Sequence, residues 1–118
     1  MKPFEVIESP GTGNERFVEL TLRGYLDAHT VSDFESRMDH LIEKGARCYL
    51  IDINELNYVS SAGIGAIMSM TQRLRRSNGE IVLVRPTDKV FKILDKLGLT
   101  KIFRLAYSRE EAEKMMDA

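Results

Sequence analysis

The length, composition and charge of the chain limit what it can be. Its 118 residues, of which 43% are hydrophobic and 30% charged, suffice for one domain with a real core and argue against disorder. The formal net charge of -1 provides no overall field to attract nucleic acid or anionic lipid. We therefore expect one domain over residues 1–118 and no nucleic-acid partner.

Cysteine content and apolar runs indicate the compartment. Cys48 is the only cysteine, so there is no disulfide framework, which fits a reducing compartment. The N-terminal stretch MKPFEVIESP lacks the apolar core of a signal peptide, and no segment approaches the roughly 20 apolar residues that span a bilayer. We expect a soluble cytoplasmic protein that does not insert into membranes.

The first half of the chain predicts a hairpin, a helix and a buried strand. Phe4 to Glu8 is short and β-prone, Pro10 to Gly13 has turn chemistry, and residues 18–23 alternate between apolar and polar side chains. Thr30 is a suitable N-cap, and the apolar spacing after it predicts an amphipathic helix. The apolar run at 49–53 is typical of a central strand buried on both faces.

The second half alternates helices with strands. A second helix is expected to begin at Ser60 or Ser61 and to run to about Ser77. A buried strand at 81–84, a third helix, a short strand near 102–105 and a last helix follow. The side chains expected to face the core are Ile64, Ile67, Thr71 and Leu74 in the second helix, and Val90, Phe91, Leu94 and Leu97 in the third.

The predicted order ββαβαβαβα defines the fold class. Strands that alternate with helices imply a largely parallel sheet with right-handed crossovers, and the opening hairpin makes the sheet mixed. No repeat, linker or low-complexity tract divides the chain. We predict a single-domain α/β fold with a mixed, mostly parallel sheet, an N-terminal hairpin and about four helices.

The stretch NYVSSAGIGAI at residues 57–67 raises the question of function. One serine would suffice to cap the helix, a contribution of about 1 kcal/mol, yet two are present. Gly63 and Gly65 each cost about 1 kcal/mol of helix stability relative to alanine. Either packing against a neighbouring strand or close approach of another group to the backbone would explain them.

Catalytic and nucleotide-binding motifs do not fit this stretch. Met68 occupies the third glycine position of G-x-G-x-x-G, and both G-K-[ST] and the nucleophile elbow G-x-S-x-G are absent. The only histidines are His40, within the first helix, and His29, in a loop that could approach Ser61. No Cys, His and carboxylate cluster has metal-ligand spacing. We expect no catalytic residue, no metal and no cofactor.

Phosphorylation is the remaining interpretation of the serines. A helix N-terminus presents free N–H groups and a partial positive charge, which would stabilise a phosphoserine that adds about -1.5 to -2 charges. The fold should tolerate this anion, whereas a partner docked over the serine would not. Such a switch acts by excluding a partner and needs no conformational change.

Three stretches together carry a family resemblance. They are LRGYLDAHT at 22–30, YLIDINELNYVSSAGIGAI at 49–67 and GEIVLVRPTDKVFKILDKLGLTKIF at 79–103. In order and spacing they resemble the STAS domain (sulphate transporter and anti-sigma factor antagonist) in its small stand-alone bacterial form. The resemblance covers nearly the whole chain in one register.

The resemblance implies a regulatory role. Anti-sigma factor antagonists of this family bind an anti-sigma factor that is also a serine kinase, and so free the sigma factor. The kinase phosphorylates the antagonist, the complex separates, and a serine phosphatase resets the system. In register with Gly63 the modified residue is Ser61. Many members carry aspartate at the preceding position, where this chain has Ser60. Because this departure places a second serine beside the first, Ser60 is the alternative site.

Residues around the serines are candidate partner contacts. Asp27 corresponds to the family's loop aspartate, expected close to the phosphoacceptor; an ordinary turn aspartate is the alternative. One side of the second helix carries small polar residues and is either a docking face or a solvated face. This side holds Ser61, Gly65, Ser69, Gln72 and Arg76, and the candidate partner-binding residues are Asp27, Ser60, Gly63, Gly65, Ser69 and Gln72.

Two other functions remain open from the sequence. The resemblance also extends to STAS domains that are constitutive cytoplasmic subunits of transporters, in which the serine need not be phosphorylated. A small enzyme that uses Ser61 is the last alternative, and only His29 is placed to serve it as a base.

Overall fold

A five-stranded sheet in the order β1-β2-β3-β4-β5 organises the chain in a computed structural model that describes residues 3–9 and 17–117. β1 is antiparallel to β2, and the later pairs are parallel. The strands are β1 (Phe4–Glu8), β2 (Val18–Leu26), β3 (Cys48–Val59), β4 (Glu80–Val84) and β5 (Arg104–Ala106); the helices are α1 (Val31–Glu43), α2 (Ser61–Arg75), α3 (Asp88–Lys96) and α4 (Arg109–Asp117), with a 3-10 turn, η1, at Leu99–Lys101.

This architecture confirms the predicted fold class. The sheet is mixed and mostly parallel, β1 and β2 form the N-terminal antiparallel pair, and four α-helices lie within the described residues. The predicted turn at Pro10 to Gly13 lies outside the described residues. β3 continues past the predicted run to Val59, so the strand leads directly to the two serines.

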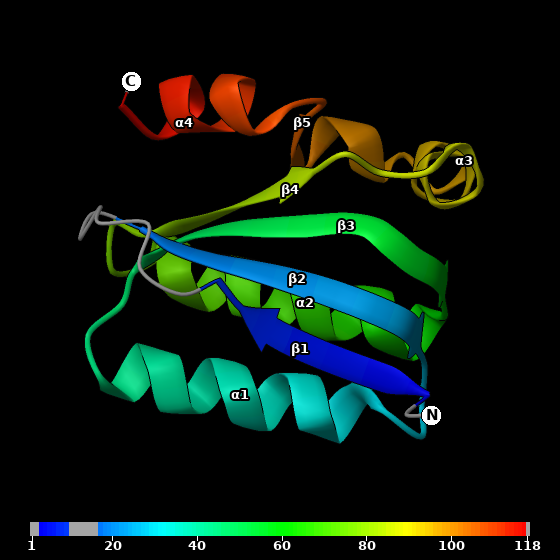
Figure 1. The fold of residues 1–118 in the computed structure, drawn as a ribbon, viewed down its shortest axis with the longest axis horizontal. Helices are drawn as coiled ribbons and strands as arrows, with labels where there is room; N and C mark the ends of the chain where they lie inside the picture. Colours follow the sequence, from blue (N-terminus) through cyan, green and yellow to red (C-terminus); the bar gives the residue numbers. More distant parts are fainter. Residues whose placement is uncertain (1–2, 10–16, 118) are drawn as a thin grey trace.

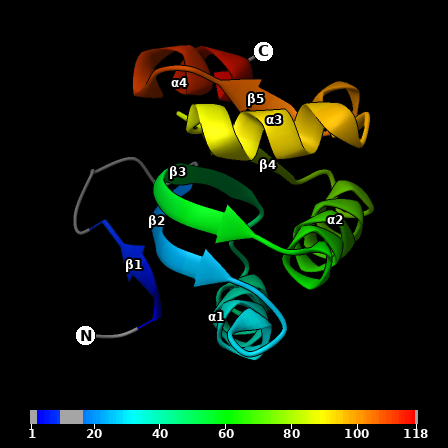
Figure 2. The ribbon, with the colours of Figure 1, turned by 90° about the vertical axis from the view of Figure 1, so that its right-hand side faces the viewer.

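Helices cover both faces of the sheet (Figures 1 and 2). α1 and α2 lie side by side against one face, α4 lies against the other, and α3 contacts β3 and η1. Successive residues of β3 face opposite sides, so Leu50 packs in the cluster under α4 and Ile51 in the larger cluster under α1 and α2. Both are buried, as predicted for a central strand.

The predicted core positions agree with the buried side chains in α2 but only in part in and after α3. Ile64, Ile67, Thr71 and Leu74 of α2 are all buried. In α3, Val90 and Leu94 are buried, whereas Phe91, which was also expected to face the core, is only half-buried.

The prediction for Leu97 is wrong, because 60% of this side chain is exposed. α3 ends at Lys96, and Gly98 follows in a left-handed conformation (φ 73°), so the chain turns and places Leu99 in the core instead.

No helix of the described residues is long and apolar enough to cross a membrane.

One polar group lies deep in the larger cluster. Tyr49 is 0% exposed, and its hydroxyl donates to the carbonyl oxygen of Ala46 at 2.8 Å. Burial raises the pKa of Tyr49 to about 12. The folded chain therefore holds the neutral phenol more firmly than the unfolded chain does.

We expect Tyr49 to make folding stability sensitive to alkali. Its folded pKa is raised, so its contribution is complete below the ordinary tyrosine pKa, near 10, and is lost as pH rises toward about 12. In an ultraviolet titration of phenolate absorbance, the wild type should show a component with its midpoint near 12 that Tyr49→Phe lacks. Tyr25→Phe, at an exposed position, is the control and should retain it. A late component that persists in Tyr49→Phe would contradict this assignment.

Candidate functional site

The two serines lie at a corner where the carboxyl ends of β2 and β3 meet the start of α2. Leu26 and Val59 are register partners at these strand ends. The Ser60 N–H then donates to the carbonyl oxygen of Leu26 at 2.9 Å, which joins the corner to the end of β2. Because Asp27 follows Leu26 directly, the loop after β2 adjoins the serines (Figure 1).

The two serines have different roles in the structure. Ser60 has an extended backbone and is the N-cap of α2, where its hydroxyl oxygen accepts a hydrogen bond from the Gly63 N–H at 3.3 Å. Ser61 is the first residue of the helix and is exposed. Within the described residues, the Ser61 hydroxyl makes no hydrogen bond to another group. The capping requirement is met by Ser60 alone, so the Ser61 hydroxyl is free for other chemistry.

The two glycines also differ. Gly63 is buried, and a Cβ there would lie 2.7 Å from the carbonyl oxygen of Leu26 and 3.0 Å from a methyl group of Val59. Gly63 is thus explained by close packing of α2 on the strand ends, and its predicted role in partner binding does not agree with this burial. Gly65 is exposed, and a Cβ there would meet nothing within 4 Å. Nothing within the described residues accounts for glycine at position 65.

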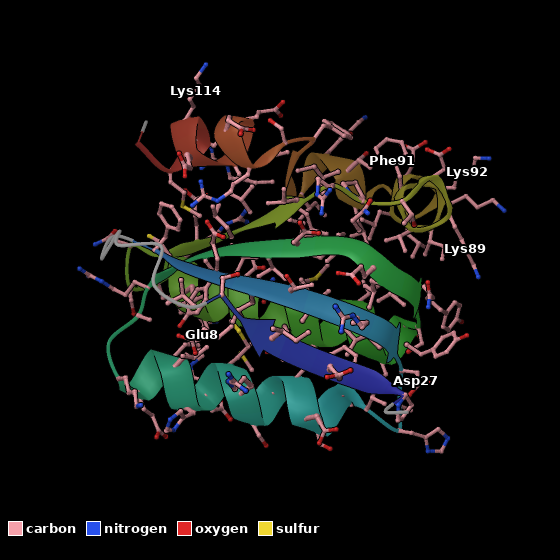
Figure 3. The ribbon with its side chains drawn as sticks, in the orientation of Figure 1. Glu8, Asp27, Lys89, Phe91, Lys92 and Lys114 are labelled. Atoms are coloured by element: carbon pink, nitrogen blue, oxygen red, sulfur yellow. The ribbon has the colours of Figure 1, made fainter. Side chains whose placement is uncertain are left out.

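Asp27 is engaged by its own turn. One carboxylate oxygen accepts from the N–H of His29 at 2.9 Å and from the N–H of Thr30 at 3.2 Å. Figure 3 shows Asp27 at the end of the molecule where β2 finishes. No hydrogen bond among the described residues links it to Ser60 or Ser61, so the geometry favours the turn aspartate over a group that orients the serine hydroxyl.

Thr30 departs from the sequence interpretation in the same loop. It occupies the N-cap position of α1, but its side chain makes no capping hydrogen bond. Its hydroxyl donates to the carbonyl oxygen of Tyr25 at 2.7 Å and accepts from the N–H of Asp27 at 3.0 Å. The buried threonine therefore fixes the loop between β2 and α1 rather than the helix end.

The polar side of α2 is exposed to solvent. Ser69 and Gln72 are exposed and follow Ser61 along one face, while the opposite face of the helix is buried in the core. Together with Gly65, they form a solvent-exposed surface without bulky rigid side chains, which begins at the helix N-terminus. We call the residues Ser61, Gly65, Ser69 and Gln72 the α2 face.

The structure does not bring either histidine into hydrogen-bonding contact with Ser60 or Ser61 among the described residues. His29 and His40 are both exposed. Residues 3–9 and 17–117 also contain no group of three Cys, His or carboxylate side chains arranged to hold a metal ion.

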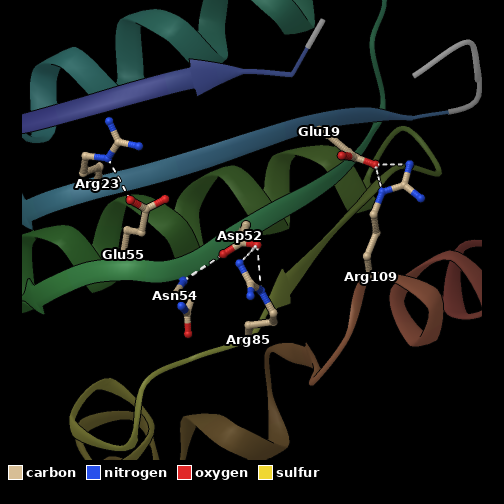
Figure 4. A network of polar contacts seen from close by, with 7 residues as sticks. All are labelled: Glu19, Arg23, Asp52, Asn54, Glu55, Arg85 and Arg109. Carbon is tan, nitrogen blue, oxygen red and sulfur yellow. Dashed lines mark hydrogen bonds and ion pairs between the residues drawn. The ribbon is translucent and has the colours of Figure 1, made fainter. Parts of the chain in front are cut away.

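A row of arginine–carboxylate pairs crosses the sheet on the side of α4 (Figure 4). Each of three arginines donates to a carboxylate on a neighbouring strand or element, and these hydrogen bonds raise the pKa of Arg23 and of Arg109. Arg109 also forms an ion pair with Glu113 of its own helix. A cavity of about 130 Å³ beside them has a mixed lining, and its charged members, Glu19, Asp52 and Arg109, already belong to these pairs. The pairs are Arg23 with Glu55 at 3.0 Å, Arg85 with Asp52 at 3.0 Å and Arg109 with Glu19, and Asp52 also accepts from the Asn54 N–H at 2.9 Å.

Two exposed tyrosines next to the corner were not singled out from the sequence. Tyr25 and Tyr58 are 49% and 41% exposed and are register partners at the ends of β2 and β3. The alternation of side chains along the strands could have identified them. Each tyrosine directly precedes a buried strand residue, Leu26 or Val59, and therefore points to the opposite side of the sheet.

Comparison with known proteins identifies the family. The STAS domain pattern matches residues 8–112, so the chain belongs to the STAS domain family, as the resemblance predicted. The relative BtrV of Bordetella bronchiseptica, which bears the name of an anti-sigma factor antagonist, is 31% identical over 91 residues. These residues cover 77% of this chain and 78% of BtrV.

Solved structures share the fold. The anti-sigma factor antagonist SpoIIAA in its unphosphorylated form has a TM-score of 0.77 and 21% identity, and the match covers 97% of this chain and 96% of SpoIIAA. The phosphorylated form of SpoIIAA, a Bacillus cell fate determinant, has a TM-score of 0.69 and 21% identity, with 95% and 97% covered. This similarity establishes the fold of the domain.

We expect alanine to have opposite effects at the two glycines. Gly63→Ala would force a Cβ against the Leu26 carbonyl and should lower the free energy of unfolding by roughly 1–3 kcal/mol. Gly65→Ala has open space and should raise it by up to about 1 kcal/mol, because alanine favours the helix. Urea unfolding of both variants measures the difference. Equal destabilisation by the two substitutions would contradict the packing described for Gly63.

Proposed function

We propose that this chain is an anti-sigma factor antagonist, a regulatory binding protein rather than an enzyme. In this proposal the unphosphorylated chain binds an anti-sigma factor that is also a serine kinase, and phosphorylation of Ser61 releases it. A serine phosphatase would reset the cycle, and the role belongs in the cytoplasm, where sigma factors act. The observation that carries the proposal is the exposed Ser61 hydroxyl, free of hydrogen bonds among the described residues, at the first position of α2.

The electrostatics of α2 support phosphorylation at this position. The first turn of α2 contains no acidic residue, whereas Asp33 lies in the first turn of α1 and Asp88 in that of α3. The N-terminal partial positive charge of α2 is therefore not offset by a side chain within its own first turn. A phosphate on Ser61 would add the missing negative charge without displacing Ser60 from its capping bond.

The shape of the α2 face supports release by exclusion. Gly65 lies one turn beyond Ser61 and costs helix stability with no internal packing reason. An exposed glycine lets a partner's backbone or side chain approach the helix closely. A phosphate at Ser61 would stand at the edge of such a contact and would separate the two surfaces through its bulk and charge.

The names of the relatives point the same way. BtrV bears an anti-sigma factor antagonist name, and SpoIIAA, an anti-sigma factor antagonist, has been solved in phosphorylated and unphosphorylated forms. A shared fold that accommodates both forms of SpoIIAA is what a switch acting by exclusion requires.

We expect charge at Ser61 to control binding. Ser61→Ala should bind the cognate kinase about as well as the wild type, whereas Ser61→Asp should fold normally but bind at least about tenfold more weakly, or about 1.4 kcal/mol. Isothermal titration calorimetry measures the affinities. Ser77→Asp is the matched control, because this exposed serine follows the far end of α2, roughly 24 Å along the helix. Equal affinities of Ser61→Ala and Ser61→Asp would refute the switch.

We also expect a single phosphorylation site. Incubation with the cognate kinase and ATP should add one phosphate, which fragment mass spectrometry should locate at Ser61. Ser61→Ala should abolish the modification, and Ser60→Ala should retain it despite the loss of the cap. Phosphate on Ser60 would move the switch to the capping residue. A kinase complex that forms without any phosphorylation would favour a constitutive STAS subunit.

A further inference from the structure

Exposed aromatic side chains form a pair beside the serines. Tyr25 and Tyr58 are register partners on adjacent parallel strands, so their side chains project from the same side of the sheet. Both are more than two-fifths exposed, although tyrosine rings are large enough to favour burial. Two neighbouring exposed rings make an apolar surface of the kind that is enriched in protein interfaces.

Lys89 of α3 borders this pair. The Lys89 ammonium lies 5.7 Å from the centre of the Tyr58 ring, a cation–π distance. Lys92 follows one turn later and is exposed, and Figure 3 shows both lysines at the end of the molecule that carries Asp27. The ion pairs among the described residues include neither lysine. We call Tyr25, Tyr58 and Lys89 the tyrosine–lysine patch; Lys92 lies further along α3.

Two nearby carboxylates are already hydrogen-bonded. Asp27 accepts hydrogen bonds from two N–H groups of its own turn, and Glu55 accepts from Arg23. Asp88 lies in the first turn of α3, where the helix N-terminus attracts negative charge. Lys89 and Lys92 are exposed and belong to none of the ion pairs among the described residues, so their positive charges are available to a partner protein.

The patch adjoins the proposed switch. Tyr58 precedes Ser61 by three residues, and the end of β2 that follows Tyr25 is tied to Ser60 by the Leu26 carbonyl. A protein that covers Ser61 would thus extend onto the patch with little further reach. A second copy of this chain is a poor occupant, because two-fold pairing would bring the lysines of both copies together.

We propose that the tyrosine–lysine patch is a second contact surface for the kinase partner and binds a region where acidic side chains surround an apolar pocket. This inference rests on the proposed function. The tyrosine rings supply buried apolar contact, and Lys89 supplies charge complementarity that selects the partner. The α2 face then carries the switch, while the patch contributes affinity and specificity.

The test compares variants of the full chain by titration calorimetry against the cognate kinase. Tyr58→Ala and Lys89→Glu should each weaken binding by about tenfold or more, and Tyr58→Phe should retain most of the affinity because it keeps the ring. Lys114→Glu on α4, which lies at the opposite end of the molecule in Figure 3, is the charge control and should bind within about twofold of the wild type. Lys89→Glu should also bind with a weaker dependence on salt.

The outcomes separate the two proposals. If Ser61→Asp weakens binding but Tyr58→Ala and Lys89→Glu bind as the wild type does, the patch proposal is overturned and the proposed function stands. If the wild type does not bind the kinase at all, both fail. Sedimentation equilibrium gives a further check: a dimer of the chain that Tyr58→Ala or Lys89→Glu dissociates would assign the patch to a second copy and overturn the inference.

Discussion

The close contact between the end of β2 and the start of α2 is the constraint on which the site depends. The Ser60 N–H donates to the Leu26 carbonyl oxygen, and the same oxygen would lie only 2.7 Å from a Cβ at residue 63. The first turn of α2 is therefore held against the strand ends by one hydrogen bond and one missing side chain. This contact fixes the direction in which the helix leaves the sheet and turns Ser61 outward.

Around this corner, structural and functional requirements are divided between neighbouring residues. Ser60 caps the helix and Gly63 permits the packing, while Ser61 and Gly65 satisfy neither requirement. Asp27 and Thr30 likewise stabilise their own loop through hydrogen bonds to its backbone. The residues with no internal role all face solvent, and they form the surface that we propose for a partner.

The element order and most core positions follow from periodicity alone, because β3 and α2 have strong apolar patterns and clear boundaries. Leu97 fails because a left-handed glycine, not the apolar spacing, decides where α3 ends. The sequence does not distinguish Gly63 from Gly65, since only the proximity of a strand carbonyl separates them. Tyr25 and Tyr58 join into one surface through strand register, which depends on residues far apart in the chain.

The separation of the cap from the neighbouring hydroxyl has an evolutionary consequence. Since Ser60 alone caps the helix, a single substitution at position 61 can remove the hydroxyl that we propose is phosphorylated and leave the architecture intact. A duplicated gene could therefore drift from regulated to permanent association without passing through an unstable ancestor. Descendants of one fold can in this way differ in whether they respond to a signal, although their overall shape is the same.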